Sequence, residues 1–460
     1  MNILYIGSGF VGTCSAAVSA ASGHNTLVFD INTEKITKLG STDRATIESC
    51  LFEKGLADLL IEHSERITFS SAYDDVEVFL DTCHVIFMCL PTPEIGETGE
   101  SDLSYYLAAA EKLAVSLAQR NSGKQDGYVV VVNKSTVPID TIDRTAEILD
   151  AAGVINYGVV SNPEFLVEGK AVQNSLKPDR VVVGATTDKD FSIMREVYQR
   201  FFDATDTTYL EVNPKEAAAG KLLANFYLFN KLAVCFDVIG RTCEAFDGIQ
   251  FEKVRKILAS DNRIGNWGFY NSLYAGGSCF IKDARSLSHQ LQKIGKAPCL
   301  VEETYLANKR QLSIFLSRAK TEAQIDWKGK TVALIGLAFK RDTNDVRNSP
   351  SIDIVRFLQE EGVAKILAYD PAARDTFSTL FPNLPTITYV DHEYLALEVA
   401  DVVIIATDWP QFRGLADMVI AQEKRPLIMD GRRMLQHRYR DLQDAGCSVI
   451  AVGSPLYLHT

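Results

Sequence analysis

The sequence predicts an α/β protein with two doubly wound domains joined by a central helical region. Three observations lead to this fold class. Short apolar strand signals alternate with helical patterns over residues 1–205, and the same alternation returns over residues 323–460. Between them, residues 206–322 hold two long stretches with helical periodicity. Alternation of strands and helices is typical of parallel sheets that are covered by helices on both faces.

The first 30 residues combine a strand, a glycine-rich turn, a helix and a second strand. Residues 1–5 form an apolar run ahead of Gly7, Gly9 and Gly12, and a second apolar run ends at Asp30. In this order Gly7 makes the turn, Gly9 lets the backbone approach a pyrophosphate, and Gly12 lets the helix pack closely on the strand. Asp30 lies 18 residues after Gly12, about the spacing of a carboxylate that bonds a ribose 2′-hydroxyl. We therefore expect a Rossmann-like domain that binds NAD in preference to NADP.

Three further strand signals end in polar or proline-containing turns. They cover residues 85–89, 129–132 and 157–160, and they are followed by Leu90-Pro-Thr-Pro93, Lys134-Ser-Thr-Val-Pro138 and Ser161-Asn-Pro-Glu-Phe-Leu166. In a doubly wound sheet, the carboxyl ends of the strands line the ligand crevice. We expect Thr92, Thr136 and Glu164 to face one cleft, although each also suits ordinary turn chemistry.

The central region starts with a helical pattern over residues 215–246 that contains no proline after its start. Lys221 and Asn225 are four residues apart and therefore share one helical face. A second helical stretch covers residues 298–320. Two long helices between two sheet domains favour a connecting and dimerising element. A solvated lysine and a surface amide are the alternative interpretation of Lys221 and Asn225.

A thiol in this region stands in an unusual run, Tyr274-Ala-Gly-Gly-Ser-Cys-Phe-Ile-Lys-Asp283. Two glycines precede Cys279, and they permit a tight turn and close approach of a ligand. Lys282 and Asp283 follow three and four residues later. A cysteine is a covalent nucleophile where nearby positive charge favours its thiolate. A buried, inert cysteine after a turn is the alternative on local grounds.

The C-terminal region repeats the strand and helix alternation, with strand signals at 331–335, 365–369, 402–407, 427–429 and 448–452. The turn after its first strand lacks the glycine spacing of the N-terminal turn, so it is a poor dinucleotide site. It carries basic side chains instead, namely Lys340, Arg341 and Arg347, and Arg432 and Arg433 follow a later strand. Basic groups at strand ends suit a phosphate-bearing ligand.

Composition excludes several classes of protein. With 47% hydrophobic and 23% charged residues, the chain of 460 residues has the composition of a globular protein. A formal charge of −12 argues against a nucleic-acid partner. Nine irregularly spaced cysteines and no secretory segment indicate reduced thiols in the cytoplasm. We expect no membrane-spanning segment, because no apolar run reaches about 18 residues, and we expect no metal site.

Taken together, the motifs resemble those of the UDP-glucose/GDP-mannose dehydrogenase family, and within it the UDP-glucose 6-dehydrogenases. The resemblance covers nearly the whole chain. The matching runs are GSGFVG, PTP, KSTVP, SNPEFLVEG, Lys221 with Asn225, DNRIG, GGSCFIKD, GLAFKRDTNDVRNSPS and DGRR. Members that use N-acetylated sugars tend to have His before the cysteine, where this chain has Ser278.

The resemblance implies a four-electron oxidation of a sugar C6 hydroxyl, from UDP-glucose to UDP-glucuronate, a step of polysaccharide biosynthesis. Cys279 would be the nucleophile that forms a thiohemiacetal and then a thioester. Lys221 would stabilise the oxyanion, and Asn225 would help to orient it. Asp283 with Thr136 would position or activate water, and Glu164 would assist as an acid or base.

The resemblance also implies the binding residues. It assigns NAD to Gly7, Gly9, Val11, Gly12, Asp30, Lys35, Thr92, Thr136 and Arg347, with Lys282 near both the cofactor and the thiol. It assigns the nucleotide sugar to Phe165, Leu166, Glu168, Lys221, Asn225, Arg263, Ser272, Gly276, Phe339, Lys340 and one of Arg432 and Arg433. Because the family's counterpart of Arg263 reaches a neighbouring subunit's site, a homodimer or a higher homo-oligomer is implied. The implied domains are an NAD-binding domain (1–205), a dimerising helical region with the cysteine loop (206–322) and a UDP-sugar-binding domain (323–460).

Some positions depart from the family pattern. Val167 stands where an arginine is usual, Ala218 where an acid is usual, and Phe236-Asp237 where the pair Asn-Glu is usual. The loop over residues 268–275 also differs. These changes leave the residues of the chemistry intact, and the preference for sugar and base stays open.

Three alternatives to a UDP-glucose 6-dehydrogenase remain at this point. One is a dehydrogenase for another nucleotide sugar, a UDP-N-acetylhexosamine or GDP-mannose. The second is a 3-hydroxyacid dehydrogenase of the 6-phosphogluconate type, which needs neither the thiol nor a second sheet domain. The third is a nucleotide-sugar sensor that binds its ligand without turnover.

Overall fold

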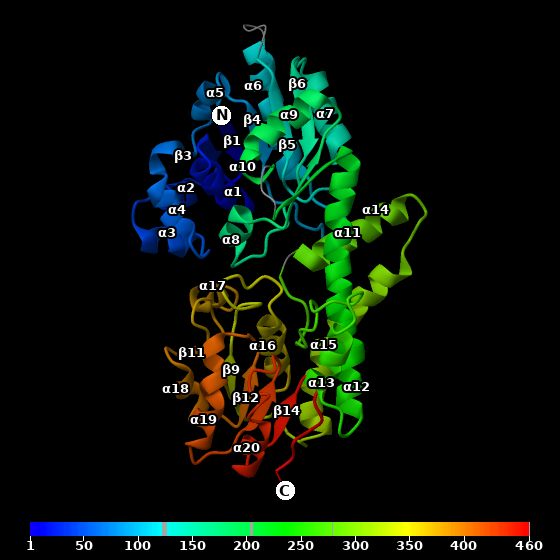
Figure 1. Cartoon of the computed structure of the whole chain (residues 1–460). Helices are drawn as coiled ribbons and strands as arrows, with labels where there is room; N and C mark the ends of the chain where they lie inside the picture. Colours follow the sequence, from blue (N-terminus) through cyan, green and yellow to red (C-terminus); the bar gives the residue numbers. More distant parts are fainter. Residues whose placement is uncertain (122–126, 203–205, 278, 460) are drawn as a thin grey trace. The chain divides into compact units, whose positions relative to one another are not determined.

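The computed structural model describes residues 1–121, 127–202, 206–277 and 279–459. Ser278, which the family resemblance used, therefore lies outside the described residues. The chain forms two compact units (Figure 1), and each is described by itself. Unit 1 consists of Met1–Ala224 and Arg285–Ala297, and unit 2 consists of Asn225–Ala284 and Pro298–Thr460.

Unit 1 is built on a sheet in which eight strands are found among the described residues, in the order β3-β2-β1-β4-β5-β6-β7-β8. Its neighbouring strands are parallel except β6 and β7, which pair antiparallel through Ser161 and Gly184. The order reverses between β1 and β4, which is the arrangement of a doubly wound sheet. The strands are β1 (Asn2–Ile6), β2 (Asn25–Phe29), β3 (Ile67–Ser70), β4 (Val85–Met88), β5 (Val129–Asn133), β6 (Tyr157–Ser161), β7 (Arg180–Gly184) and β8 (Thr208–Val212).

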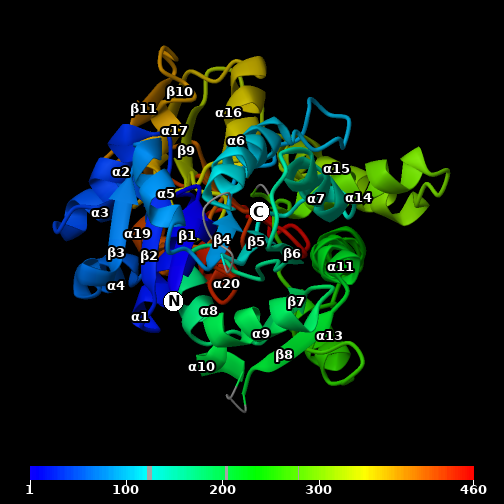
Figure 2. The same ribbon diagram turned by 90° about the horizontal axis from the view of Figure 1, so that it is seen from above.

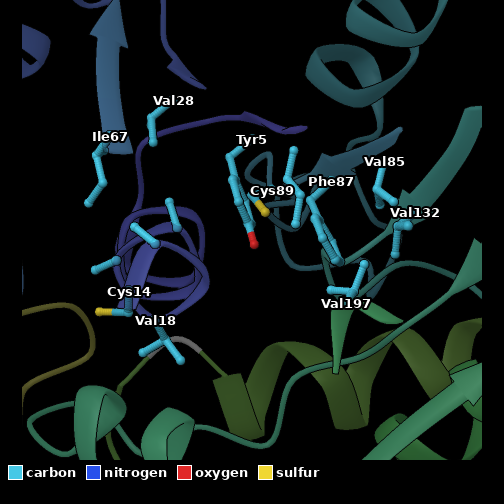
Figure 3. Close-up of a cluster of buried hydrophobic side chains, with 14 of the residues drawn as sticks. Tyr5, Cys14, Val18, Val28, Ile67, Val85, Phe87, Cys89, Val132 and Val197 are labelled. Atoms are coloured by element: carbon cyan, nitrogen blue, oxygen red, sulfur yellow. The ribbon is translucent and has the colours of Figure 1, made fainter. Parts of the chain in front are cut away.

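Helices cover both faces of this sheet (Figure 2). They are α1 (Phe10–Ala21), α2 (Thr33–Leu39), α3 (Arg44–Cys50), α4 (Leu56–Glu62), α5 (Tyr73–Leu80), α6 (Ser104–Asn121), α7 (Thr141–Ala151), α8 (Ala171–Leu176), α9 (Asp188–Val197) and α10 (Gln199–Phe202), with a short 3₁₀ turn at Ser64–Arg66. One core lies between the sheet and α1, where Tyr5 and Phe87 stack with ring centroids 4.9 Å apart (Figure 3). The other core packs α5, α6 and α7 against the opposite face.

Unit 2 contains a parallel sheet in which the described residues supply six strands, in the order β11-β10-β9-β12-β13-β14. The order again reverses, here between β9 and β12. The strands are β9 (Thr331–Ile335), β10 (Lys365–Tyr369), β11 (Ile387–Tyr389), β12 (Val402–Ile405), β13 (Leu427–Asp430) and β14 (Val449–Ala451). The helices are α12 (Arg241–Ala245), α13 (Phe251–Ala259), α15 (Cys299–Thr321), α16 (Pro350–Glu360), α17 (Arg374–Ser378), α18 (Glu393–Leu397), α19 (Leu415–Ile420) and α20 (Tyr439–Asp444), with a 3₁₀ turn at Pro410–Gly414. The predicted fold class, with two doubly wound sheets and long helices between them in the sequence, is confirmed.

Two helices contribute residues to both units. The first is α11 (Pro214–Ala233), which continues through a π-helical segment, η2 (Val234–Gly240), into α12. The second is α14 (Cys279–Lys293). The sequence placed Cys279 in a loop segment, and the structure shows that it begins a helix.

The helical segment Pro214–Ala245 corrects one expectation. Its most apolar 18-residue window has a mean hydropathy of 1.5, so by length and composition it could cross a membrane. No such segment was expected from the sequence, because no apolar run reaches about 18 residues. Only about one third of that window is buried, and Lys221 of the same helical segment is an ion-paired, buried residue. A helix of a protein core or a protein interface passes the same test.

Candidate active site

The glycine turn after β1 has the geometry that its sequence predicts. Gly7 has a φ of +103°, and a Cβ atom there would lie 2.4 Å from the carbonyl oxygen of Cys89. A Cβ atom on Gly12 would lie 2.0 Å from the carbonyl oxygen of Gly7, which shows how closely α1 packs on the turn. Gly9, in contrast, faces open space. Gly7 and Gly12 are thus required by the fold, whereas Gly9 leaves room for a ligand at the start of α1.

Asp30 closes the same turn from the end of β2. Its Oδ2 accepts hydrogen bonds from the Ser8 backbone N–H at 2.8 Å and from Ser8 Oγ at 2.7 Å, and its Oδ1 accepts one from Asn32 N–H at 3.0 Å. Burial alone would raise the pKa of Asp30, but these hydrogen bonds and nearby Lys35 outweigh it and lower the pKa below its usual value. The carboxylate therefore stays ionised beside an open turn, and these residues fit NAD through its pyrophosphate and ribose.

The loops after β4 and β5 bond to each other. Thr92 Oγ1 donates to the carbonyl oxygen of Thr136 at 2.8 Å. Both loops also contact the part of α14 that belongs to unit 1, where Arg285 Nε donates to Glu94 at 2.7 Å and Ile139 N–H donates to Gln290 at 2.9 Å. Thr92 and Thr136 therefore lie together, and a cleft that they share with Glu164 stays a prediction.

Glu164, in the loop after β6, forms a buried ion pair with Lys221 of α11. Lys221 Nζ lies 3.0 Å from Glu164 Oε1, and the side chains are only 5% and 11% exposed. Glu164 Oε2 also accepts the Leu166 backbone N–H at 2.5 Å. Burial raises the pKa of Glu164, but Lys221 and the Leu166 N–H outweigh it, and the pKa is lowered. Glu164 is therefore an ionised carboxylate next to an ammonium group, a state suited to accepting a proton.

The ring of Phe165 carries two cations near its face. Arg180 lies 3.8 Å from the ring centroid, and Lys221 Nζ lies 5.4 Å from it. Leu166 and Glu168 follow in the same loop and are partly exposed, while Val167, the first departure from the family pattern, is 49% exposed. Ala218, the second departure, is buried one turn before Lys221.

In unit 2, Cys279 is the first residue of α14 and is exposed. Backbone N–H groups at the first turn of a helix stabilise a thiolate. Asp283 lies one turn further on, so it shares a helical face with Cys279. Its carboxylate is buried and accepts hydrogen bonds from Asn225 Nδ2 at 2.5 Å and from Lys282 Nζ at 2.6 Å. Asn225, Lys282 and Asp283 thus form one polar cluster.

The glycines before Cys279 pack against the segment after β9. Gly277 has a φ of +81°, and a Cβ atom there would lie 2.9 Å from the ring of Phe339. A Cβ atom on Gly276 would lie 2.5 Å from the carbonyl oxygen of Asn348. Gly277 N–H donates to the carbonyl oxygen of Arg347 at 3.1 Å. The two glycines therefore make room for a protein loop, which brings Gly276 and Phe339 together.

The Arg432 and Arg433 pair separates into two roles. Arg432 Nη2 donates to the carbonyl oxygen of Phe339 at 3.2 Å and to Asp408 at 3.1 Å, so it lies at the turn that carries Lys340. Arg433 Nη1 donates to the carbonyl oxygens of Val452 and Gly453 and to Ser454 Oγ. Of the two, Arg432 is placed to meet a ligand at the Phe339–Lys340 turn, and Arg433 holds the segment after β14.

Asp370, which the sequence analysis did not single out, occupies in unit 2 the place that Asp30 has in unit 1. Its Oδ2 accepts N–H donors from Leu337 at 2.7 Å and Ala338 at 3.1 Å, and also from Trp409 Nε1 at 3.1 Å. Trp409 thus gives this carboxylate an indole donor, where Asp30 has the Ser8 hydroxyl. The poor suitability of the second turn for a dinucleotide stays a prediction from its lack of the glycine spacing.

The sequence matches known proteins along almost its whole length. Residues 1–202 match the NAD binding domain of the UDP-glucose/GDP-mannose dehydrogenase family, residues 215–310 match its central domain, and residues 333–437 match its UDP binding domain. The chain belongs to the UDP-glucose/GDP-mannose dehydrogenase family. It is accordingly an NAD-dependent nucleotide-sugar dehydrogenase with an NAD-binding domain and a UDP-binding domain, as expected.

Individual relatives support the same assignment. The chain is 33% identical to a UDP-glucose 6-dehydrogenase of Pseudomonas aeruginosa, with 94% of each chain covered. It is also 33% identical to a UDP-glucose 6-dehydrogenase of Bacillus subtilis, over 98% of this chain and 93% of that one. A UDP-glucose dehydrogenase structure from Pyrobaculum islandicum superposes with a TM-score of 0.84 at 28% identity, covering 95% of both chains.

The remaining residues assigned by the family resemblance lie outside the two polar clusters. Arg263 is held by Asp261 through two donors, with 90% of its side chain exposed. Ser272 is buried, and its Oγ donates to the carbonyl oxygen of Tyr274 at 3.4 Å. Arg347 forms an ion pair with Asp345 at 2.5 Å. Val11 is partly exposed in the first turn of α1.

No cluster of three or more His, Cys, Asp or Glu side chains suited to a metal ion occurs in the described part of the chain. Two buried ionised residues beside the Glu164 loop, Glu53 and Lys134, were not singled out by the sequence analysis as site residues. Lys134 stands in the KSTVP run, which was its only signal. Glu53 has no local signal, because its partners lie more than 100 residues away in the sequence.

Proposed function

We propose that this member of the family oxidises the C6 hydroxyl of UDP-glucose to a carboxylate, which gives UDP-glucuronate and consumes two NAD⁺. The observation that carries the proposal is the cluster at the start of α14. An exposed thiol there lies one helical turn from a buried carboxylate that Asn225 and Lys282 hold in place. The full-length similarity to UDP-glucose 6-dehydrogenases supports UDP-glucose as the substrate.

Cys279 allows two oxidations at one carbon. The alcohol first loses a proton and a hydride and becomes an aldehyde. The thiolate then adds to the aldehyde carbon, and the tetrahedral thiohemiacetal loses a second hydride to leave a thioester. Water cleaves the thioester, which releases the carboxylate and returns the thiol. NAD⁺, when bound, accepts the hydride in each oxidation.

Lys221 and Glu164 serve the charges that develop in these steps. The Lys221 ammonium stabilises the oxyanion of the tetrahedral carbon, since it is buried and held 3.0 Å from Glu164. The Glu164 carboxylate accepts the proton of the alcohol. Asp283 takes a proton from the water that cleaves the thioester, Asn225 orients Asp283, and Thr136 helps to place the water.

The binding residues follow the same proposal. NAD is held by Gly7, Gly9, Val11, Gly12, Asp30, Lys35, Thr92, Thr136, Lys282 and Arg347. The nucleotide sugar is held by Phe165, Leu166, Glu168, Lys221, Asn225, Arg263, Ser272, Gly276, Phe339, Lys340 and Arg432. The geometry of Arg433, whose donors meet backbone carbonyls, favours Arg432 over it.

A substrate panel tests the proposal. Purified protein is incubated with NAD⁺ and UDP-glucose, UDP-N-acetylglucosamine, UDP-galactose or GDP-mannose, and NADH is measured by absorbance. We expect UDP-glucose to react best and to yield two NADH per sugar. A faster reaction with another nucleotide sugar would show that this other sugar is the substrate, while the dehydrogenase activity itself would stand. No NADH from any nucleotide sugar would overturn the proposed activity.

We also propose that the chain acts in the cytoplasm as a homodimer. All nine cysteines lie in the described ranges and form no disulfide bond, which suits a reducing compartment. A stripe of exposed apolar side chains follows α11 and η2 at spacings of four and seven residues. Leu223, Tyr227, Val234 and Val238 in this α11 stripe are 52%, 66%, 42% and 56% exposed, and an unpartnered stripe of this kind suits contact with a second copy.

A further inference from the structure

The loop over residues 162–171 carries Glu164, Phe165, Leu166 and Glu168, and a pocket lies along part of it. Pro163, Glu164, Phe165 and Leu166 line this pocket together with Tyr5 and residues of α1. Dispersion forces fix a segment only where atoms are in contact. The ion pair with Lys221 holds Glu164 and the Arg180 cation lies on the Phe165 ring, so the middle of the loop is fixed by these contacts, and two further buried charges hold its ends.

Glu53 holds the C-terminal end of the loop. It lies in the chain between α3 and α4 and is only 2% exposed. Its Oε2 accepts the Gly169 backbone N–H at 2.8 Å, and its Oε1 accepts the Ala171 N–H at 2.6 Å. Both carboxylate oxygens are thus used, and both bond to backbone atoms of the loop. Hydrogen bonds to a buried charged acceptor are stronger than those between neutral groups.

Lys134 holds the N-terminal end of the loop. It follows β5 and is 7% exposed. Its Nζ donates to Asn162 Oδ1 at 2.8 Å and to the hydroxyl of Tyr198 at 3.3 Å. Asn162, itself 1% exposed, also receives a hydrogen bond from Tyr198 at 2.6 Å and donates to the carbonyl oxygen of Val182 at 2.7 Å. Asn162 is two residues from Glu164, so the Lys134 ammonium fixes the N-terminal end of the 162–171 loop.

We propose that Glu53 and Lys134 are positioning residues that hold the 162–171 loop in the geometry that binds the nucleotide sugar. The proposal rests on the proposed function, because it takes Glu164, Phe165, Leu166 and Glu168 as residues of the sugar site. Neither anchor touches substrate in this scheme. Each acts through backbone or amide groups of the loop.

The charges of the two anchors define a pH range for sugar binding. Burial raises the pKa of Glu53 to about 6, against the backbone N–H groups that lower it, and Cys14 of α1 and Glu168 of the loop face the same carboxylate. Burial lowers the pKa of Lys134 to about 8, and Cys89, Glu164, Lys221 and Tyr198 surround it. Below about pH 6 Glu53 gains a proton and can no longer accept at both oxygens. Above about pH 8 Lys134 loses its charge. Both anchors are ionised only between these values.

Steady-state kinetics of four variants provide the first test. Glu53→Gln keeps the shape but offers one acceptor oxygen, and Lys134→Met keeps the length but removes the ammonium. We expect each to raise the KM for UDP-glucose at least tenfold at pH 7, with the KM for NAD⁺ changed less than twofold. Glu62→Gln and Lys177→Met, at exposed positions of the same unit, should leave both constants within twofold. Equal rises in both KM values would overturn the proposal.

The pH profile separates positioning from a merely structural role. In the unaltered protein the KM for UDP-glucose should rise below about pH 6 and above about pH 8, since the diphosphate of the sugar does not titrate in this range. Glu53→Gln should lose the acidic rise, and Lys134→Met should lose the alkaline rise. Lys134→Met should also retain its melting temperature, because Tyr198 still bonds to Asn162. Unchanged profiles in both variants would overturn the proposal.

Hydrogen exchange of the unaltered, ligand-free protein tests the anchors without any turnover. The amides of Gly169 and Ala171, after correction for intrinsic rates, should exchange at least tenfold faster at pH 5 than at pH 7, and amides in the core strand β5 should not. This result would stand even if no nucleotide sugar proved to be a substrate, so it distinguishes failure of the anchors from failure of the proposed function. Equal protection of both amides at the two pH values would overturn the proposal.

Discussion

At the scale of single residues, the site is marked by charges that are buried and paired. Lys221 and Glu164 lie 3.0 Å apart at 5% and 11% exposure, and Asp283 is bonded by Asn225 and Lys282. Burying two charges costs several kcal/mol per ion, and their attraction only partly offsets this. A protein gains little stability from such pairs, so their presence at one loop and one helix points to chemistry.

Removing one partner of the buried pair should destabilise the protein. We expect Glu164→Gln to lower the free energy of unfolding by about 3–5 kcal/mol, because it leaves the Lys221 ammonium buried without its counter-ion. Urea denaturation measures this. The double variant Glu164→Gln with Lys221→Met should recover most of the loss, since it removes both charges. A double variant as unstable as the sum of the singles would contradict the pairing.

Substitution of Cys279 should affect the activity, whereas substitution of the other exposed cysteine, Cys299, should not. We expect Cys279→Ser to lower the rate of NADH formation from UDP-glucose by at least about 100-fold, since an alcohol neither adds as readily as a thiolate nor leaves an activated ester. Cys299 is also exposed and begins a helix, so Cys299→Ser is the matched control and should keep full activity. Equal activity of the two variants would argue against a thiol intermediate.

At the scale of elements, both sheets have a glycine turn after their first strand and an aspartate that bonds to this turn, but the surroundings of the two aspartates differ. Gly7 and Gly336 both have a φ near +100° after the first strand of their sheet. Asp30 and Asp370 both accept the backbone N–H of the residue after that glycine. The difference is Trp409, whose indole N–H donates to Asp370 in unit 2, whereas the Ser8 hydroxyl donates to Asp30 in unit 1.

This difference predicts opposite effects of one substitution at the two acids. Asp30→Asn should raise the KM for NAD⁺ about 10- to 100-fold and weaken the preference over NADP⁺, because a bond to a charged group contributes about 1.5–3 kcal/mol. Asp370→Asn should leave the KM for NAD⁺ within twofold but lower the melting temperature, since all its partners are internal. Steady-state kinetics and thermal melts measure both. A loss of NAD⁺ affinity in Asp370→Asn would contradict the assignment.

Sequence patterns located most of the elements but missed four strands. The strands at residues 331–335 and 365–369 were predicted with the bounds that the structure has. Three of the missed strands, β3, β8 and β11, lie at sheet edges. Edge strands are short and have less surface to bury, so their apolar pattern is weak. The fourth, β7, is apolar but joins β6 through a single antiparallel pair.

At the scale of the whole molecule, buried charge makes stability depend on pH. The pKa of Lys134 is lowered by burial from 10.5 to about 8, so the unfolded chain binds this proton more tightly than the folded protein does. Relative to Lys134→Met, the free energy of unfolding of the unaltered protein should therefore rise by roughly 3 kcal/mol as the pH increases from about 8 to 10.5. Chemical denaturation of the unaltered protein and of Lys134→Met checks this, because the variant should lack that rise.

The α11 stripe predicts how the whole chain associates. A single chain has a mass of 50.8 kDa, and we expect light scattering to give twice that value. Val238→Arg introduces a charge into the stripe and should shift the protein toward the mass of one chain. Val78→Arg, at a residue of α5 that is 74% exposed, is the control and should leave the mass unchanged. A single-chain mass for the unaltered protein would contradict the proposed dimer.

The sequence by itself determined the features that depend on neighbouring residues. The glycine spacing before α1, Asp30 after β2 and the apolar runs of the central strands specify an NAD-binding doubly wound fold, since each depends on local backbone geometry or on side-chain periodicity. The run around Cys279 and the helical spacing of Lys221 and Asn225 marked these residues as candidates, and the family resemblance then implied their roles.

The tertiary structure alone decided which of these residues meet. Three contacts depend on how distant segments of the chain cross. They are the ion pair of Lys221 with Glu164, the hydrogen bond from Asn225 to Asp283, and the bonds of Arg432 that Arg433 does not share. Glu53 shows this most clearly, because its carboxylate bonds to backbone N–H groups 116 and 118 residues away. Backbone donors carry no side-chain signal, so only the folded chain reveals that an acid far from the site holds its loop.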